Sequence, residues 1–448
     1  MSTALPPPAL SGWRLNLAAS ALAFATYFCM YAFRKPFAAA TYPGEAWLGL
    51  TPKTLFVISQ IVGYTVSKYL GIAWVSEIGR RGRCAMIVGL IGAAELALFG
   101  FALLPPAGKV LALFCNGLPL GMIWGLVVRY LEGRRASELM LAALSCSFIV
   151  ASGIVKDVGR WLLSHGVNEF WMPATAGLLF LPALLLSAAL LDRLPDPDLA
   201  DQAEREARPP MTALARREFA LRFLPGLVLL LLVYLGLTAF RDFRDNYGVE
   251  LFDELGYAQQ PALFSRTELP VGLLVLAIMS SLYRVRGRER GLRALFAVMT
   301  AGLALLGAAT LALDGNWLSG QSWMICVGLG AYLAYVPFSS FLFDRLMAAT
   351  RFAGTAVFAV NLADAVGYTG SVSMQLYKDL LVANASRLGF FKSFSYGLSL
   401  GGCALLLLAG VYFGRSVSSK TGPEETGPEE TGLQETGLQE TGRDRGRS

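Results

Sequence analysis

The chain has 448 residues, of which 55% are apolar and only 16% are charged. Soluble domains carry about 25% charged residues, so this composition excludes a soluble globular protein and predicts a polytopic membrane protein. The net charge of +6 could suggest nucleic-acid binding, but the Lys and Arg residues lie mostly in short loops between apolar runs. That distribution is the positive-inside pattern of membrane proteins, so we expect no nucleic-acid partner.

Twelve apolar segments are long enough to cross a membrane, which takes roughly 20 residues per helix. A polar stretch separates them into two groups of six. The first group covers 15–40, 55–78, 84–104, 110–130, 139–163 and 171–191, and the second covers 223–240, 263–283, 292–313, 323–343, 355–376 and 394–413. The sequence therefore predicts an all-α protein with twelve transmembrane helices.

Composition divides the chain into four parts. A first six-helix unit spans 1–191, a cytoplasmic linker 192–217, a second six-helix unit 218–414, and a repeat tail 415–448. The tail repeats the pentads Thr-Gly-Pro-Glu-Glu and Thr-Gly-Leu-Gln-Glu, which cannot bury a core and predict disorder. Arginines gather in the loops on one side, so we expect that side and both termini to be cytoplasmic, with the protein in the cell inner membrane.

A charged cassette occurs once in each half. Residues 27–37 read Tyr-Phe-Cys-Met-Tyr-Ala-Phe-Arg-Lys-Pro-Phe, and 234–241 repeat the Tyr-to-Arg spacing and the Ala-Phe-Arg ending. Two helical turns separate Tyr from Arg in each copy, so both side chains fall on one helical face. A charge at membrane depth is costly and marks a functional site. Repeated charged helices at corresponding depth are typical of a transporter with a central binding site.

The arrangement of six helices, a polar linker and six more, with corresponding motifs in both halves, resembles the major facilitator superfamily over about Trp13 to Gly414. This resemblance implies two pseudo-symmetric six-helix bundles that work by alternating access. The superfamily's signature between helices two and three is loosely present in 71–83, with Glu77 as its acidic residue. In that pattern the acidic group helps latch the two halves on the inner side.

Particular residues resemble the organophosphate:inorganic phosphate antiporters within that superfamily. They are the Tyr-rich segment ending in Arg34-Lys35, the element Ser67-Lys68-Tyr69 in helix two, and Arg241 in helix seven. Helix five departs from this branch, because Ser145-Cys-Ser-Phe148 stands where those antiporters have a histidine. The chain as a whole looks more like a separate bacterial branch of the superfamily.

Three cations form the predicted anion site. The resemblance implies that helices one, two and seven face a central cavity, where Arg34, Lys68 and Arg241 could converge on one anionic group. An arginine offers an oxyanion a planar fork of donors, and a lysine offers a compact point charge. Three hydroxyl side chains would add donors or serve only as packing: Tyr27, Tyr31 and Tyr234.

Local neutralisation is the alternative for both arginines. Asp242 and Asp245 closely follow Arg241 in the sequence. Arg34 could instead direct its charged end outward to water. Either arrangement would make the arginines structural rather than substrate-binding.

Carboxylates at membrane depth are the candidates for ion coupling. Asn361 and Asp364 lie one turn apart in helix eleven, and Glu268 lies in helix eight. A carboxylate in a low dielectric takes up a proton more readily, so Asp364 or Glu268 could couple proton movement to transport, with Asn361 beside them. A static salt bridge from Asp364 to Lys68, Lys156 or an arginine is the alternative. For Lys156 with Asp157 we favour a structural role.

The sequence contains no Walker motif, metal-binding cluster or nucleophile triad, so we expect no enzymatic activity, no cofactor and no metal. We predict a secondary active transporter, a symporter or an antiporter, that moves a small organic anion, phosphorylated or not, by alternating access. The alternative is a transporter-like membrane sensor for an anionic solute. Apart from that solute and the lipid bilayer we expect no partner, and a monomer is the working expectation for the oligomeric state.

Overall fold

The computed structural model describes residues 12–47, 49–77, 79–131, 134, 137–195, 213–258, 260, 262–285, 287–350, 352 and 357–418. The predicted disordered tail from residue 419 on and most of the predicted linker lie outside this part, whereas 415–418 belong to the last helix. The side chains of 70–78 and of Arg81, which make up most of the loop signature, also lie outside it. Within the described ranges the chain forms no β-strand, and its only bridge joins Trp47 and Leu50.

Five of the first half's long helices run unbroken for most of their expected length, and the first is interrupted. The elements are α1 (Trp13–Met30), η1 (Tyr31–Phe33), η2 (Pro36–Ala39), α2 (Pro52–Glu77), α3 (Arg80–Leu103), α4 (Pro106–Leu131), α5 (Ser137–Ser164) and α6 (Met172–Asp192). The prediction of one helix over 15–40 is wrong, because α1 ends at Met30 and continues as the 3₁₀ turns η1 and η2. Pro36 has no N–H to donate and disfavours helical geometry in the residue before it, which accounts for the break.

The second half contains six more long helices and several short ones. They are α8 (Ala213–Arg222), α9 (Leu224–Asn246), α10 (Gly248–Glu254), α11 (Leu263–Tyr283), α12 (Arg288–Asp314), α13 (Gly320–Ser340), α14 (Leu342–Thr350), α15 (Val357–Leu376), the π-helical turn η3 (Tyr377–Leu381) and α16 (Arg387–Ser418). Ten helices of the described part are long and apolar enough to span a membrane. With α2 and α15, which carry Lys68 and Asp364, they match the twelve predicted helices.

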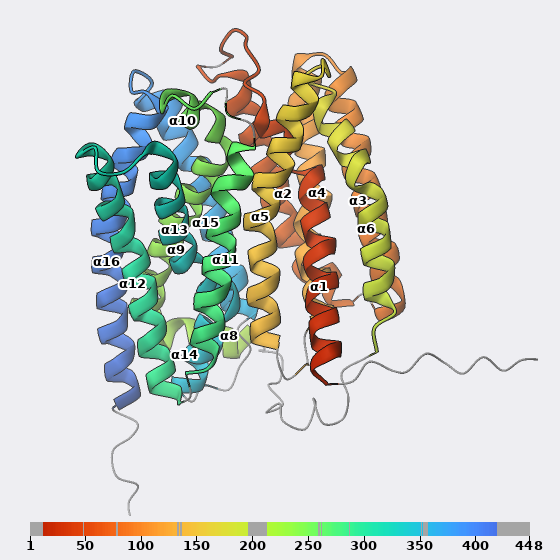
Figure 1. The fold of residues 1–448 in the computed structure, drawn as a ribbon. Helices are drawn as coiled ribbons and strands as arrows, with labels where there is room; N and C mark the ends of the chain where they lie inside the picture. The colour runs from red at the N-terminus through yellow and green to blue at the C-terminus, as the bar shows by residue number, and fades with distance from the viewer. Residues whose placement is uncertain are drawn as a thin grey trace, which may run out of the picture.

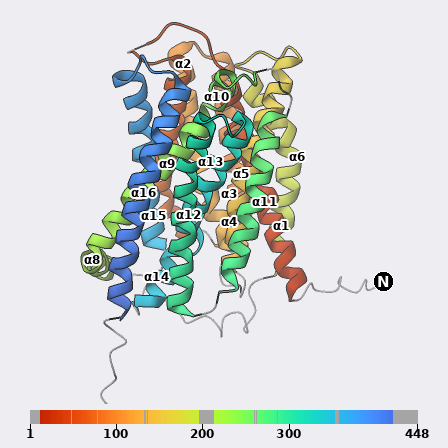
Figure 2. The same cartoon turned by 60° about the vertical axis from the view of Figure 1, so that its left-hand side comes forward.

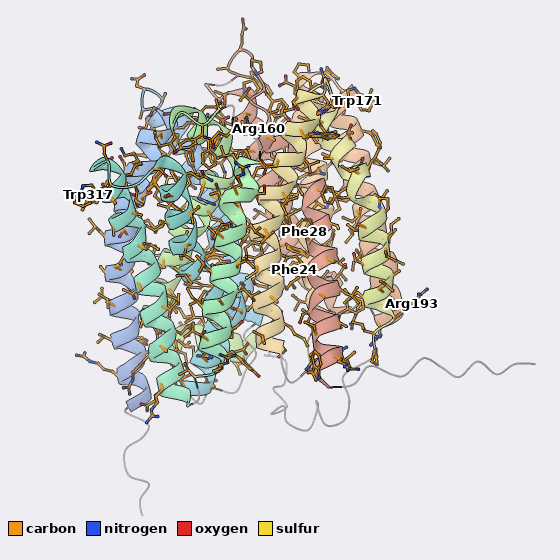
Figure 3. All side chains as sticks on the ribbon, viewed as in Figure 1. Phe24, Phe28, Arg160, Trp171, Arg193 and Trp317 are labelled. Carbon is orange, nitrogen blue, oxygen red and sulfur yellow. The ribbon has the colours of Figure 1, made fainter. Side chains whose placement is uncertain are left out.

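The long helices stand side by side, with α10 at one end of the bundle and α8 and α14 at the other (Figure 1). A view turned by 60° shows α8 at the same end as α14 (Figure 2). We call these ends the α10 end and the α8 end. Trp171 and Trp317 lie toward the α10 end and Arg193 toward the α8 end (Figure 3). Trp171 and Trp317 are exposed, as expected of aromatic anchors near a membrane interface.

Two helix pairs make the main contacts between the halves. In the first half α4 packs against α2 and α3, and α1 against α5 and α6, while in the second half α12 packs against α13 and α16, and α9 against α15 and α16. Between the halves, α5 contacts α11 and α2 contacts α15. A Cβ atom at Gly153 of α5 would lie only 2.8 Å from the carbonyl oxygen of Phe264 on α11. Glycine at this position therefore permits a close crossing of the two halves.

Candidate functional site

Helices from both halves bring polar side chains together near the middle of the bundle. Tyr64 lies midway along α2, Tyr234 midway along α9, and Asp364 near the middle of α15. Transporters built from two repeated halves hold their substrates at this depth. These residues mark the candidate site, and the predicted cations lie around them.

Arg34 is buried without a counter-ion. Its side chain comes from the turn that follows η1, is 4% exposed, and places Cζ 3.9 Å from the ring centroid of Tyr64 and 5.8 Å from that of Tyr31. Its Nε has no hydrogen-bond partner, and no carboxylate of the described residues forms an ion pair with it. Cation–π contact compensates only part of the desolvation of a guanidinium. Arg34 is therefore a buried cation whose charge no described carboxylate neutralises by an ion pair.

Arg241 occupies the matching place in the second copy of the cassette, but it is already paired. Its Nη2 and Nε lie 2.8 and 3.2 Å from Oδ1 of the adjacent Asp242, whose Oδ2 accepts a hydrogen bond from Ser371 at 2.8 Å. The guanidinium also lies 4.3 Å from the ring centroid of Tyr335. Local neutralisation by Asp242 thus holds in this conformation, and the two copies of the cassette differ in their charge partners.

Lys68 and Asp364 form an ion pair between the two halves. The Lys68 ammonium lies 3.1 Å from Oδ2 of Asp364, and the Tyr234 hydroxyl donates to Oδ1 at 2.7 Å. The Tyr234 hydroxyl also lies 3.0 Å from that of Tyr335. The salt bridge considered from the sequence for Asp364 is therefore formed in this conformation. Asn361 is half-buried on the preceding turn and makes no side-chain hydrogen bond within the described residues.

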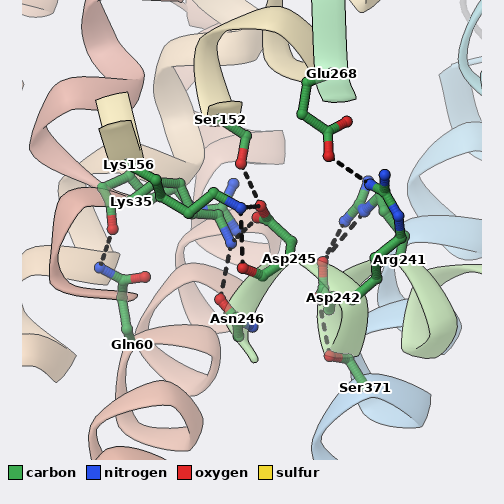
Figure 4. A network of polar contacts seen from close by, with 12 residues as sticks. Lys35, Gln60, Ser152, Lys156, Arg241, Asp242, Asp245, Asn246, Glu268 and Ser371 are labelled. Atoms are coloured by element: carbon green, nitrogen blue, oxygen red, sulfur yellow. Dashed lines mark hydrogen bonds and ion pairs between the residues drawn. The ribbon is translucent and has the colours of Figure 1, made fainter. Parts of the chain in front are cut away.

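A second interhalf cluster lies nearer the α10 end. The carboxylate of Asp245 on α9 forms ion pairs with the ammonium groups of Lys35, 2.5 Å from Oδ2, and Lys156, 2.7 Å from Oδ1. It also accepts a hydrogen bond from Ser152 (Figure 4). Lys35 donates in addition to Asn246 at 3.0 Å. These contacts tie the turn after α1 and helix α5 to the end of α9. They fasten the two halves together at this level.

Glu268 and Asp157, two further acids considered from the sequence, each have a structural partner. Glu268 of α11 pairs with Arg244 of α9 at 2.7 Å, within the second half. Asp157 does not pair with Lys156. It accepts hydrogen bonds from the backbone N–H groups of Ser265 at 2.6 Å and Phe264 at 3.2 Å, at the beginning of α11. A carboxylate is favourable there because the N–H groups of a helix start lack partners.

One connected set links most of the predicted site residues. It runs from Arg34 over Tyr64 to Lys68, then through Asp364, Tyr234 and Tyr335 to Arg241. Tyr31 joins it beside Arg34, and Tyr27 packs edge-on against Tyr31 with ring centroids 5.6 Å apart. Glu268 and Asn361 lie outside this connected set.

Sequence reasoning missed three tyrosines and one lysine. Tyr64 lies between Arg34 and Tyr368, whose ring meets it edge-on with centroids 5.1 Å apart, and Tyr335 faces Arg241. A signal existed for two of them, because Tyr64 lies four residues before Lys68 and Tyr368 four residues after Asp364. That spacing places each tyrosine on the same helical face as its charged neighbour. The sequence marked Lys35 only as the second cation of the Arg34-Lys35 pair and gave no indication of its ion pair with Asp245.

Comparison with known proteins identifies the family. Residues 36–416 match the family described as "Family of unknown function (DUF5690)". The chain belongs to this family. None of the curated proteins compared with the sequence matches it.

Solved structures of transporters share the fold seen in this DUF5690 member. The nucleoside transporter NupG aligns with a TM-score of 0.56 and 14% identity, over 89% of this chain and 99% of its own. A D-xylose-proton symporter gives 0.54 and 15%, over 90% and 97%. A POT family transporter in complex with a thioalcohol conjugated peptide gives 0.54 and 14%, over 90% and 96%. The chain is thus a multi-pass membrane protein with the fold of major facilitator transporters.

Proposed function

We propose that this protein is a secondary active transporter of a small organic anion that works by alternating access of its two halves. Arg34 carries the proposal. Its guanidinium lies against Tyr64, midway along α2, and is 4% exposed, with an unpartnered Nε and no carboxylate paired to it within the described residues. Leaving a buried charge without its partner typically costs about 3–5 kcal/mol, so such a group is kept where a ligand supplies the opposite charge.

The charge balance around Arg34 supports an anionic substrate. The cations of the two clusters described above and of the Arg244 pair are Arg34, Lys35, Lys68, Lys156, Arg241 and Arg244, and their carboxylate partners are Asp242, Asp245, Glu268 and Asp364. Because Lys35 and Lys156 share one carboxylate and Arg34 has none, these six cations face four carboxylates. A carboxylate or phosphate group of the substrate would offset this excess.

Substrate binding at Arg34 would couple to the movement of the halves. Arg34 belongs to the first half, and the tyrosine-lined path from it leads to Asp364 and Arg241 in the second. An anion that contacts both arginines would favour the conformation in which they approach each other. Arginine binds carboxylate and phosphate alike in a bidentate manner, so a phosphorylated substrate, as in the organophosphate antiporters, is one form of this proposal.

The experiment begins with a thermal-shift screen of the purified full-length protein against carboxylated and phosphorylated metabolites, because a ligand of the folded state raises its melting temperature. The compound that stabilises the protein is then tested for uptake into proteoliposomes. We expect Arg34→Lys to lose at least tenfold in affinity, since a lysine keeps the charge but not the planar fork. The matched control is Arg293→Lys, an exposed arginine on α12 that pairs only with Glu289.

Three results would contradict the proposal. Equal affinity of the parent and Arg34→Lys would exclude Arg34 from the site. Stabilisation by neutral or cationic metabolites alone would exclude an anionic substrate. Tight anion binding without any flux would instead favour the transporter-like sensor.

A further inference from the structure

Glu95 is a buried acid that none of the contacts described above uses. It lies on α3, which spans Arg80–Leu103, so it stands well inside the membrane-crossing part of the first half. Its side chain is 6% exposed, and neither carboxyl oxygen has a hydrogen-bond partner. Asp245 and Asp364, by contrast, each have a cation beside them, and Asp157 accepts two backbone N–H groups.

A glycine on the neighbouring helix α6 leaves room for the Glu95 carboxyl group. Gly177 of α6 lies opposite, and a Cβ atom there would collide with Oε2 of Glu95 and approach the ring of Phe33 to 3.1 Å. Any larger residue at position 177 would displace the acid. The glycine on α6 therefore lets the Glu95 side chain on α3 pack directly against the α6 backbone.

Among the described residues, the groups that face the Glu95 carboxyl supply no positive charge. Helices α4 and α6 and the turn η1 pack against α3. On α4 the nearby polar side chain is Asn116, and α6 carries no titratable residue between Met172 and Leu191. Tyr31 and Arg34 flank Phe33, but the Arg34 guanidinium is directed onto the Tyr64 ring. An ionised carboxylate in these surroundings would lack both water and a counter-ion, so the neutral acid is favoured.

A hydrogen-bond path connects the neighbourhood of Glu95 to Arg34. The Asn116 amide donates to the carbonyls of Ala94 and Phe33, both at 3.0 Å. Gln60 donates to the Asn116 side-chain oxygen at 2.8 Å and to the Arg34 carbonyl at 3.0 Å. A shift of α3 at Glu95 would therefore reach the backbone that carries Arg34 and Lys35.

We propose that Glu95 is a proton-binding site, protonated in this conformation, and that it supplies the proton coupled to anion transport. When α3 and α6 shift during the transport cycle and water reaches the carboxyl, its O–H transfers the proton to water and the carboxylate remains. The coupling rests on the proposed transport function, whereas the protonation itself does not. Glu95 thus joins Asp364 and Glu268, the two acids that the sequence suggested for this task.

The test is infrared spectroscopy of the full-length protein in lipid at neutral pH, because the C=O stretch of a protonated carboxyl is separate from the carboxylate bands. We expect a protonated-carboxyl band that Glu95→Gln abolishes, that Glu95→Asp shifts, and that the exposed control Glu289→Gln leaves unchanged. Glu95→Gln should also fold normally, since glutamine reproduces the shape and neutrality of the protonated acid.

An unchanged band in Glu95→Gln would overturn the proposal, because Glu95 would then be ionised. Failure of Glu95→Gln to fold, while Glu95→Asp folds and shows no band shift, would overturn it as well. The proposed function fails separately. If no anion stabilises the protein but the Glu95 band is present, proton binding stands and anion transport does not.

Discussion

Replacement of Asp245 by asparagine should loosen the junction between the halves toward the α10 end. Asp245 is buried and forms ion pairs with two lysines of the first half, Lys35 at 2.5 Å and Lys156 at 2.7 Å. Removing one partner of a buried ion pair costs about 3–5 kcal/mol, because the remaining charge stays desolvated. Asparagine keeps one acceptor oxygen for the two lysines, so we expect the low end, about 3 kcal/mol.

That free energy corresponds to a population change of about a hundredfold, since each 1.4 kcal/mol is a factor of ten. The assay is native-state hydrogen exchange of the purified protein, read in the peptides that contain η1, η2 and the end of α9. We expect protection there to fall about a hundredfold in Asp245→Asn and to stay unchanged elsewhere. Asp253→Asn, an exposed change on the neighbouring α10, is the matched control.

A double-mutant cycle decides whether loss of the ion pair causes the lower hydrogen-exchange protection of Asp245→Asn. Lys156→Met removes one of the two charges that Asp245→Asn leaves without a partner, so the double variant should recover part of the protection lost in the single variant. Strict additivity of the two changes, or equal protection in Asp245→Asn and the parent, would refute this account of the cluster.

Three further predictions concern the interhalf contacts. Asp364→Asn removes the charge that holds Lys68, so proton-driven accumulation should fail while substrate exchange across proteoliposomes persists; accumulation that is unchanged at every pH would make the residue purely structural. Tyr234→Phe removes a hydrogen bond to that carboxylate and should lower the free energy of unfolding by about 1–3 kcal/mol, measured by denaturant titration. Gly153→Val should impair uptake because the valine side chain would clash with the Phe264 carbonyl oxygen on α11. A Cβ atom alone would already lie only 2.8 Å from that oxygen. Gly89→Val, in open space on α3, is the control for that loss.

The sequence alone was sufficient for the number, place and class of the helices. Each of the twelve apolar segments corresponds to a long helix, because a membrane span must satisfy its backbone hydrogen bonds internally over about 20 residues. It also marked Arg34, Lys68, Arg241 and Asp364, since charge is rare at that depth. The break after Met30 could have been anticipated from Pro36, and the continuous helix expected there was wrong.

Only the tertiary structure decided which charges meet. Arg34 and Arg241 look equivalent in the repeated cassette, yet in the structure Arg241 forms an ion pair with Asp242, whereas no carboxylate of the described residues forms one with Arg34. Lys35 pairs with Asp245 because η2 packs on α9, and Lys68 pairs with Asp364 because α2 packs on α15. Hydropathy and helical period are local properties that neighbouring residues determine. The partner of a buried charge depends on which helices cross at its depth, and no local pattern encodes that crossing.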